Sequence, residues 1–249
     1  KIINEIFSRK YKNIFLGGNI GKSLSENVYL ELQNNTKCIH IVEISSFQLE
    51  HIYTFKPLVS CILNITEDHL DRYKCLKDYF ITKTNITKNH DKESFVVYNQ
   101  DDTLLNNFYK SYKNKKPFSI KNKNNDIVID KKNIYFKNDK VYLKQSEINL
   151  IGEHNLYNIV AAITIAAIFK LKNSIIIESI KKFKPLAHRL EILDIFSDIK
   201  FINDSKGTNI YSTKSAIESI NENIVLILGG SKDTIERKQL IEVINKKHI

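Results

Sequence analysis

Short runs rich in valine and isoleucine alternate with helical stretches through the first part of the chain, and this alternation limits the fold more than any other feature. The runs predict four strands, at 13–16, 38–44, 58–65 and 94–98. The intervening stretches predict helices, chiefly at 2–7, 23–32 and 76–88. Apolar strands joined by helices form parallel sheets that are covered on both faces. The sequence therefore predicts an α/β fold with a mostly parallel central sheet flanked by helices.

The sequence pattern changes between residues 117 and 150. There, short strand-like runs separated by polar turns predict a small antiparallel appendage. An alanine-rich helix is expected over 153–170. We expect a domain boundary near Pro185, which divides the chain into a first domain at 1–185 and a second at 186–249. The second is short for a domain and reads as the start of another α/β unit. Its expected elements are strands at 189–194, 199–203 and 224–228 and a helix at 210–220.

Composition excludes several classes of protein. The 249 residues are 42% apolar and 27% charged, which is ordinary for a soluble globular chain, and no apolar run is long enough to span a bilayer. Three cysteines and no secretory signal favour a reduced, cytoplasmic protein. The net charge of +10 comes from lysines spread evenly along the chain, so we expect no nucleic-acid partner and no membrane partner. Methionine is absent even from position 1, and we expect the chain to be a piece of a longer one.

Polar side chains gather where two of the expected strands end. Glu43 follows one strand, and Asp68 and His69 follow the next. If these strands are parallel neighbours, the carboxylate and the imidazole lie on one rim, where they can ligate a divalent cation or act as an acid–base pair. The alternatives are a strand-end carboxylate that reaches water and a histidine that caps a helix.

Two downstream segments carry groups suited to a nucleotide. Asn155 and Asn158 share one face of the expected helix, where their side-chain amides can hydrogen bond to the edge of a purine base. Capping of the helix start is an alternative role for them. Arg189 begins an expected strand and suits bidentate contact with phosphate or carboxylate. In the turn at 203–209, Asp204 can hold a ribose and Lys206 phosphate oxygens, beside a helix N-terminus.

Six segments together are more specific than any one of them. In order and spacing they resemble the Mur ligase family, and more narrowly its D-glutamate-adding members, over essentially the whole chain. The strings at 45–50 and 203–209 distinguish those members from the tripeptide-forming and folylpolyglutamate-forming ones. The segments are Gly-Gly-Asn-Ile-Gly at 17–21, Glu-Ile-Ser-Ser-Phe-Gln-Leu-Glu at 43–50, Asn-Ile-Thr-Glu-Asp-His-Leu-Asp-Arg-Tyr at 64–73, Gly-Glu-His-Asn at 152–155, His-Arg-Leu-Glu at 188–191 and Asn-Asp-Ser-Lys-Gly-Thr-Asn at 203–209.

The resemblance implies a cytoplasmic, monomeric ATP-dependent ligase of peptidoglycan synthesis that uses Mg²⁺. In such a reaction the carboxylate of UDP-N-acetylmuramoyl-L-alanine takes the γ-phosphoryl group of ATP, and the amine of D-glutamate attacks the resulting acyl phosphate. Because two anions must approach one another, cations must neutralise them. The resemblance also implies that 1–185 is the central ATP-binding domain and that 186–249 is part of a Rossmann-like C-terminal domain.

The resemblance assigns roles to particular residues. It implies that Glu43, His69 and a carbamylated Lys83 are the catalytic and metal-binding groups, although Lys83 taken alone reads as a solvated lysine. Nucleotide contacts are implied for Asn155, Asn158, Arg189, Asp204 and Lys206. Substrate contacts are implied for Asn19, Ser46, His188, Thr208 and Lys232, the last on a string, Gly-Gly-Ser-Lys at 229–232, that matches the family poorly.

The chain also departs from the family pattern. The phosphate-binding loop Gly-x-x-Gly-Lys-Ser/Thr and the nucleotide-holding N-terminal domain are expected upstream of Lys1, and the end of the D-glutamate pocket is expected beyond Ile249. We therefore expect the chain alone to be inactive. Two other readings stay open: a different Mur-type or folylpolyglutamate-type amino-acid ligase, and a nucleotide-binding fragment without turnover.

Overall fold

The computed structural model describes the chain except for residues 68–71, 131, 209, 230–236 and 248. The chain divides into two compact units. Unit 1 comprises Lys1–Glu147 and Tyr157–Lys181, and unit 2 comprises Ile148–Leu156 and Lys182–Ile249. The division assigns the loop before residue 153 to unit 2, whereas the sequence predicted a single boundary near 185. That boundary stays a prediction.

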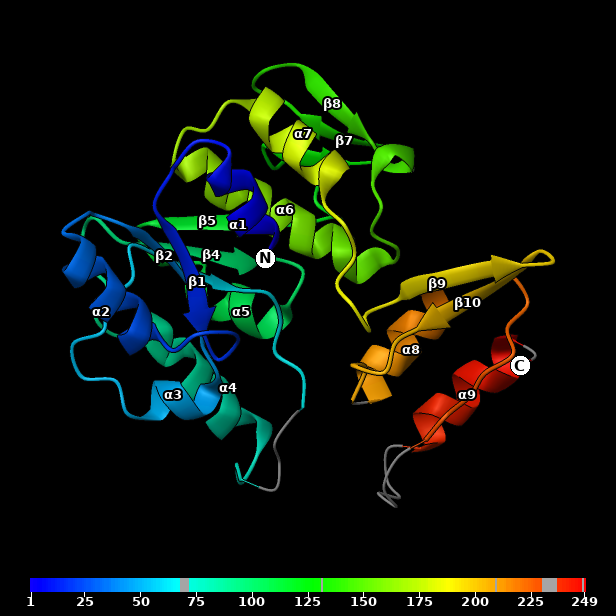
Figure 1. The fold of residues 1–249 in the computed structure, drawn as a ribbon. Coiled ribbons are helices and arrows are strands. Elements are labelled where there is room, and N and C mark those ends of the chain that lie inside the picture. The colour runs from blue at the N-terminus through cyan, green and yellow to red at the C-terminus, as the bar shows by residue number, and fades with distance from the viewer. Residues whose placement is uncertain (68–71, 131, 209, 230–236, 248) are drawn as a thin grey trace. The chain divides into compact units, whose positions relative to one another are not determined.

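Parallel strands form the centre of unit 1. Strands β1 (Ile14–Gly18) and β2 (Ile39–Glu43) pair in parallel, and their register sets Gly18 opposite Glu43. A second parallel sheet has the order β3 (Val59–Ile62), β4 (Phe95–Asn99), β5 (Lys115–Phe118). In Figure 1, α1 (Ile2–Ser8) and α6 (Glu153–Ile168) lie above these strands and α3 (Ser46–Glu50), α4 (Leu76–Thr84) and α5 (Thr103–Tyr109) lie below. Helices on both faces explain why the central strand β4 is buried along most of its length.

Side-chain caps begin three of these helices. Ser23 accepts a hydrogen bond from the backbone N–H of Glu26 at the start of α2 (Leu24–Asn34). Ser45 and Gln48 form a capping box at the start of α3. Asp102 accepts from the backbone N–H of Leu105 at the start of α5. The short 3-10 helix η1 (Asn85–Thr87) continues α4 without capping.

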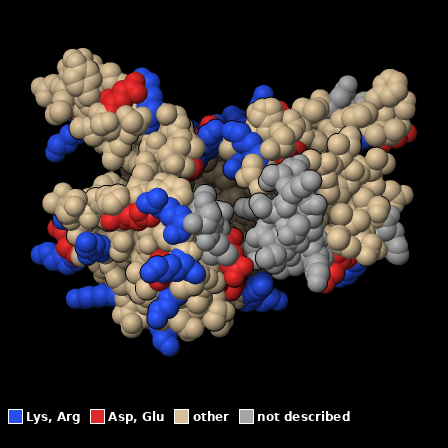
Figure 2. Space-filling model, turned by 90° about the horizontal axis from the view of Figure 1, so that it is seen from below, with Lys and Arg blue, Asp and Glu red and all other residues tan. Residues whose placement is uncertain are grey.

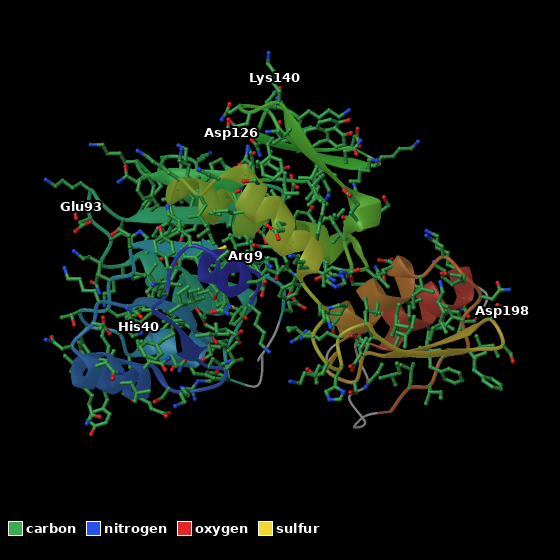
Figure 3. All side chains as sticks on the ribbon, turned by 45° about the horizontal axis from the view of Figure 1, so that its top comes forward. Arg9, His40, Glu93, Asp126, Lys140 and Asp198 are labelled. Carbon is green, nitrogen blue, oxygen red and sulfur yellow. The ribbon has the colours of Figure 1, made fainter. Side chains whose placement is uncertain are left out.

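Strand β4 and helix α6 supply much of the core of unit 1. Val96, Val97 and Tyr98 of β4 are at most 1% exposed, as are several residues of α6. The Phe7 ring of α1 packs edge-on against Phe169, with ring centroids 4.9 Å apart. Arg9, labelled in Figure 3, follows α1 and pairs through Nη1 with Oε1 of Glu178 at 3.3 Å. That ion pair ties α1 to α7 (Asn173–Lys182).

The appendage of unit 1 is an antiparallel three-stranded sheet. Its order is β6 (Ile127–Ile129), β7 (Asn133–Phe136), β8 (Val141–Lys144), followed by the 3-10 helix η2 (Gln145–Glu147). Lys140, labelled in Figure 3, lies at the turn between β7 and β8 with a positive φ of 53°. The predicted antiparallel appendage is confirmed.

In the described part of unit 2, an antiparallel strand pair is accompanied by the helices α8 and α9. Strands β9 (Glu191–Phe196) and β10 (Ile199–Asn203) form the pair, and α8 (Ile210–Ser219) packs against α9 (Arg237–Lys247). The strand predicted at 224–228 does not form, because residues 224–229 have no strand partner among the described residues. Val225 and Ile227 are accordingly 96% and 93% exposed.

The α/β fold class is confirmed, with differences in the pairing of strands. The described residues form two separate parallel sheets, and β2 and β3 share no hydrogen-bonded ladder. Strand β5 was not predicted, because its sequence Lys-Lys-Pro-Phe has no apolar run. Its proline is tolerated since β5 pairs on one side only. All three cysteines are free thiols as predicted; Cys38 and Cys61 are half-buried, and Cys75 is exposed.

Candidate functional site

The carboxyl ends of β1 and β2 bring Asn19 beside Glu43. The backbone N–H of Asn19 donates to the carbonyl oxygen of Glu43 at 2.7 Å, and the Asn19 amide Nδ2 donates to Oε1 of Glu43 at 3.4 Å. Gly18 makes this approach possible. Its φ is +101°, and a Cβ at this position would lie 2.3 Å from the Glu43 carbonyl oxygen. The predicted metal ligand and the predicted substrate contact are therefore neighbours.

Ser46 lies in the first turn of α3, three residues beyond Glu43. It is 3% exposed, and its side chain hydrogen bonds to the hydroxyl of Tyr73. The same hydroxyl donates to Oε1 of Glu50 at 2.7 Å. Ser46 thus helps to hold Tyr73 against α3.

Lys83 is a half-buried lysine in the last turn of α4. Its ammonium nitrogen lies 5.6 Å from the centroid of the Tyr79 ring, one turn earlier in the same helix. Helix α4 packs against α3, which begins just after Glu43. The alternative of an ordinary solvated lysine is therefore weakened, since the side chain is partly enclosed.

His69 and Lys232 lie outside the described residues. In the rest of the chain, no group of three or more His, Cys, Asp or Glu side chains is placed to hold a metal ion. Mg²⁺ nevertheless needs few protein ligands, since it is usually bound by one or two carboxylates together with substrate phosphates and water. Glu43 fits that requirement because its carboxylate is exposed at a strand end and, among the described residues, accepts a long hydrogen bond of 3.4 Å from Asn19.

Asn155 and Asn158 lie on one face of α6, as predicted. The Asn155 amide Nδ2 donates to the carbonyl oxygen of Ile151 at 2.7 Å, and its backbone N–H donates to Gly152 at 3.0 Å. The local role at the helix start, which the sequence left open as an alternative, is thus present for Asn155.

Unit 2 brings four predicted residues into one connected turn. The Leu190 N–H donates to Oδ1 of Asp204 at 3.0 Å, and the Lys206 N–H donates to the carbonyl oxygen of His188 at 3.0 Å. The Asn203 amide Nδ2 lies 2.8 Å from Nδ1 of His188. The structure therefore joins the segments at 188–191 and 203–208, and it leaves the side chains of His188, Arg189, Lys206 and Thr208 exposed.

His154 adds a group near this turn that the sequence did not single out. Its Nδ1 lies 3.0 Å from the hydroxyl of Ser215 in α8. Partial desolvation lowers the pKa of His154, while the charges of Asp204 and Arg189 act on it in opposite directions. Its neighbour Gly152 has φ +96°, and a Cβ there would lie 2.8 Å from the imidazole. His154 is thus held among the candidate nucleotide contacts of unit 2.

A second cluster missed by the sequence lies in unit 1. Glu50, at the end of α3, binds Arg72 and Tyr73, which follow the undescribed residues 68–71. Glu50 is the last residue of the string Ser-Ser-Phe-Gln-Leu-Glu. The sequence motif therefore included Glu50, but it did not indicate that Arg72 and Tyr73 are its partners.

The family description "Mur ligase middle domain" matches residues 1–166. Because this match covers more than half of the chain, and the fold is the one described above, the protein belongs to the Mur ligase family. It matches along nearly its whole length curated relatives that are named UDP-N-acetylmuramoylalanine–D-glutamate ligase.

Two such relatives come from Clostridioides difficile and Fusobacterium nucleatum. The first is 36% identical over 97% of this chain and 54% of its own length. The second is 38% identical over 99% of this chain and 56% of its own length. The chain therefore spans about half the length of the curated relatives that it matches.

Solved structures share the fold at lower identity. The MurF ligase from Thermotoga maritima in complex with ADP aligns with a TM-score of 0.71 and 17% identity over 88% of this chain and 52% of its own. A UDP-N-acetylmuramoyl-L-alanyl-D-glutamate–2,6-diaminopimelate ligase aligns with a TM-score of 0.69 and 14% identity over 99% of this chain and 57% of its own. These likenesses establish the fold.

Proposed function

We propose that this chain is part of an ATP-dependent ligase that joins D-glutamate to UDP-N-acetylmuramoyl-L-alanine in peptidoglycan synthesis. The observation that carries the proposal is identity of 36–38% along nearly the whole chain to ligases named for that reaction. The folylpolyglutamate-type and diaminopimelate-adding alternatives are less well supported. The chain is only 14% identical to the diaminopimelate ligase of known structure.

The proposed cofactors are ATP and Mg²⁺. Bound Mg²⁺ would neutralise phosphate oxygens and so lower the barrier to attack between two anions. Glu43 is the described carboxylate that fits this role, and the proposal assigns His69 and a carbamylated Lys83 to the same group. In support, Lys83 is partly enclosed on a helix that packs against α3. A solvated lysine would not be expected in that setting.

The chain's own residues would hold and orient the reactants. Asn19, beside Glu43, is the proposed contact to the muramoyl substrate, with Ser46, His188, Thr208 and Lys232 as further substrate contacts. The nucleotide contacts in the proposal are Asn155, Asn158, Arg189, Asp204 and Lys206. The connected turn of unit 2 supports the second set, because it fixes Asp204 and leaves Arg189 and Lys206 exposed for phosphate.

The proposal includes a monomer in the cytoplasm, where nucleotide-linked substrates are made. Among the described residues, no helix is both long and apolar enough to cross a membrane. On the face shown in Figure 2, lysine and arginine side chains are interspersed with aspartate and glutamate. That distribution gives the proposal no reason to include a nucleic-acid partner.

The test is phosphate release by the product of the reading frame that encodes this chain, taken from its own start codon to its own stop codon. UDP-N-acetylmuramoyl-L-alanine and ATP are supplied with D-glutamate, L-glutamate or diaminopimelate in parallel. We expect release that depends on D-glutamate. Equal rates with either of the other amino acids would reject the substrate assignment, and no release with any of them would reject the ligase.

A further inference from the structure

His154, in the first turn of α6, has an imidazole ring that is held by its neighbours in unit 2. Its Nδ1 lies 3.0 Å from the hydroxyl oxygen of Ser215 in α8. At Gly152, two residues earlier, a Cβ would lie 2.9 Å from that Nδ1 and 3.1 Å from the Cβ of Ser219, one helical turn after Ser215. All of these residues belong to unit 2. The ring is therefore fixed between a glycine and one face of α8.

The other ring nitrogen of His154, Nε2, is left for a ligand. No hydrogen bond joins Nε2 to any residue that the structure describes, and His154 as a whole is exposed. The residue is the second of α6, a helix of 16 residues, and the first N–H groups of a helix have no partner within it. The partial positive charge of such a helix start favours a bound anion and disfavours a protonated imidazole. Nε2 is consequently suited to hydrogen bonding with an anionic group.

The charges that act on His154 come from the connected turn of unit 2. Burial lowers the pKa of His154, and of the two charges Asp204 raises this pKa and Arg189 lowers it. Asp204 is held in place, since its Oδ1 accepts from the Leu190 N–H at 3.0 Å and its carbonyl oxygen accepts from the Gly207 N–H at 2.8 Å. Because the two charges oppose each other and burial keeps the pKa below its ordinary value of 6.5, the ring is mainly neutral at pH 7.

A phosphate group bound at this turn would change the balance of charge. Arg189 and Lys206 have exposed side chains that suit phosphate. Phosphate bound to them would offset the positive charge of Arg189 and add negative charge of its own, and both effects favour the imidazolium. An imidazolium carries an N–H on each nitrogen, so Nδ1–H can donate to the Ser215 hydroxyl while Nε2–H donates to a phosphate oxygen.

We propose that His154 is a phosphate-binding residue of the nucleotide site and that its imidazole takes up a proton from the solvent when ATP binds. The inference rests on the proposed function for the nucleotide itself. It adds a residue to that site and gives Ser215 the role of holding the ring. It also makes ATP binding depend on pH. The affinity rises as pH falls through the pKa that His154 has in the complex, and it levels off below the lower pKa that His154 has in the free protein.

The test is isothermal titration calorimetry of ATP into the product of the whole reading frame, without the muramoyl substrate or an amino acid. Titrations at pH 6.5 in PIPES and in Bis-Tris, which differ in enthalpy of ionisation, give the number of protons taken up per ATP bound. We expect the wild type to take up about half a proton more than His154→Gln. The proton change of ATP itself is the same for both proteins and cancels in this difference. His154→Gln is also expected to bind ATP about tenfold more weakly at pH 6.5, since a hydrogen bond between charged groups is lost.

His51→Gln is the matched control. His51 is an exposed histidine of unit 1 whose Nε2 lies 3.8 Å from Oε2 of Glu50, and it has no place in the proposed site. We expect this variant to match the wild type in both affinity and proton uptake. Ser215→Ala removes the partner of Nδ1 and is expected to lose part of the extra proton uptake. Ser215→Thr keeps a hydroxyl and is expected to retain it.

The outcomes separate this inference from the proposed function. If the wild type binds no ATP, the proposed function and the role of His154 are rejected together. If the wild type binds ATP and His154→Gln takes up as many protons as the wild type, the nucleotide site stands and the role of His154 is overturned. Contact of His154 with the base or the ribose alone would give that second result. Should His154→Gln not fold by circular dichroism, Ser215→Ala decides the question, and proton uptake equal to that of the wild type would overturn the role.

Discussion

Asp204 has a structural role as well as its proposed role in nucleotide binding, and a test of the second role must leave the first intact. Its Oδ1 accepts from the N–H of Leu190, a residue that is 5% exposed. Asp204→Ala would leave that buried donor unpaired and is expected to cost about 1–3 kcal/mol of stability. Asp204→Asn keeps an acceptor oxygen and removes only the charge.

We therefore predict that Asp204→Asn folds with a urea midpoint close to that of the wild type and binds ATP more weakly. Isothermal titration calorimetry at matched ionic strength measures the second effect. Asn203→Asp is not suited as a control, since Asn203 also contacts His188. Lys214→Gln on the neighbouring α8 is suited, since Lys214 makes only a 4.0 Å exposed ion pair to Glu218. Unchanged ATP affinity in Asp204→Asn would refute the role.

A second residue-scale prediction concerns Lys83. If its amine is carbamylated to provide a carboxylate near the cation, Lys83→Ala in the product of the whole reading frame is expected to lose ligase activity by about 10–100-fold, as loss of a group that supports a metal commonly does. Short carboxylic acids such as acetate are expected to restore part of the activity by occupying the space. Lys77→Ala, on the same helix, is the control. Activity of Lys83→Ala equal to that of the wild type would refute the carbamate role.

His90 makes the stability of unit 1 depend on pH. Its Nε2 lies 2.8 Å from the hydroxyl of Ser60, which is 1% exposed, and its Nδ1 is buried without a hydrogen-bond partner. Burial lowers the pKa of His90 from its ordinary value of 6.5, while Asp91 opposes that shift. Because the folded protein prefers neutral His90, its contribution is complete above pH 6.5 and is lost as pH falls through the lowered pKa.

We predict that the free energy of unfolding falls between pH 7.5 and pH 5 more steeply in the wild type than in His90→Gln. The glutamine retains a donor for Ser60 and does not titrate. Urea unfolding followed by circular dichroism at a series of pH values gives the two slopes. Equal slopes would show that another group is responsible for any pH dependence.

At the scale of elements, the β1–β2 pair depends on a glycine. Gly18 combines a φ of +101° with a carbonyl oxygen 2.3 Å from the position of a Cβ. We predict that Gly18→Ala destabilises the protein by about 1–3 kcal/mol, the cost of strained backbone. It should also displace Glu43 and reduce Mg²⁺ binding. Gly229→Ala is the control, since no described atom lies within 4 Å of a Cβ at that position. Similar urea midpoints for the two variants would contradict the prediction.

Elements also show what the sequence could and could not predict. The strands at β1, β2 and β4 were found within two residues, because each contains a run of β-branched or aromatic residues. Strand β5 was missed because an edge strand needs few apolar side chains, and its Lys-Lys-Pro-Phe has one. The run at 224–228 has the composition of a strand but lacks a neighbouring strand to pair with among the described residues. A strand-like composition therefore predicts a strand correctly only where the fold also supplies a neighbouring strand for pairing.

The same distinction applies to the candidate site. The family resemblance gave Asn19 and Glu43 separate roles and did not place them side by side, whereas the structure shows that they are in contact. Glu50 was quoted as part of a motif, yet its pairing with Arg72, 22 residues away, depends on the folded chain. Ion pairs between distant segments have no periodicity in the sequence, so spacing alone does not reveal them.

At the scale of the whole molecule, the two units differ in how much apolar surface they bury. In unit 2 few of the described apolar residues are buried: Leu190, Ala216, Ile217 and Val243. Others are widely exposed, including Leu193 at 60%, Phe196 at 69% and Ile199 at 59%. Unit 1, by contrast, encloses most of β4 and α6. Burial of apolar surface is the main source of stability, so unit 2 is expected to be the less stable unit.

We predict that hydrogen exchange followed by mass spectrometry separates the units in the isolated 249-residue chain. Backbone amides of β9, β10 and α8 are expected to exchange faster than those of β4 and α6 under native conditions. The last part of α6 belongs to unit 1, so its protection should match that of β4. In low urea, unit 2 should lose its protection first, while the pairing of β1 with β2 persists. Protection that is uniform across both units, and that is lost in a single step with urea, would show that buried area does not set their relative stability here.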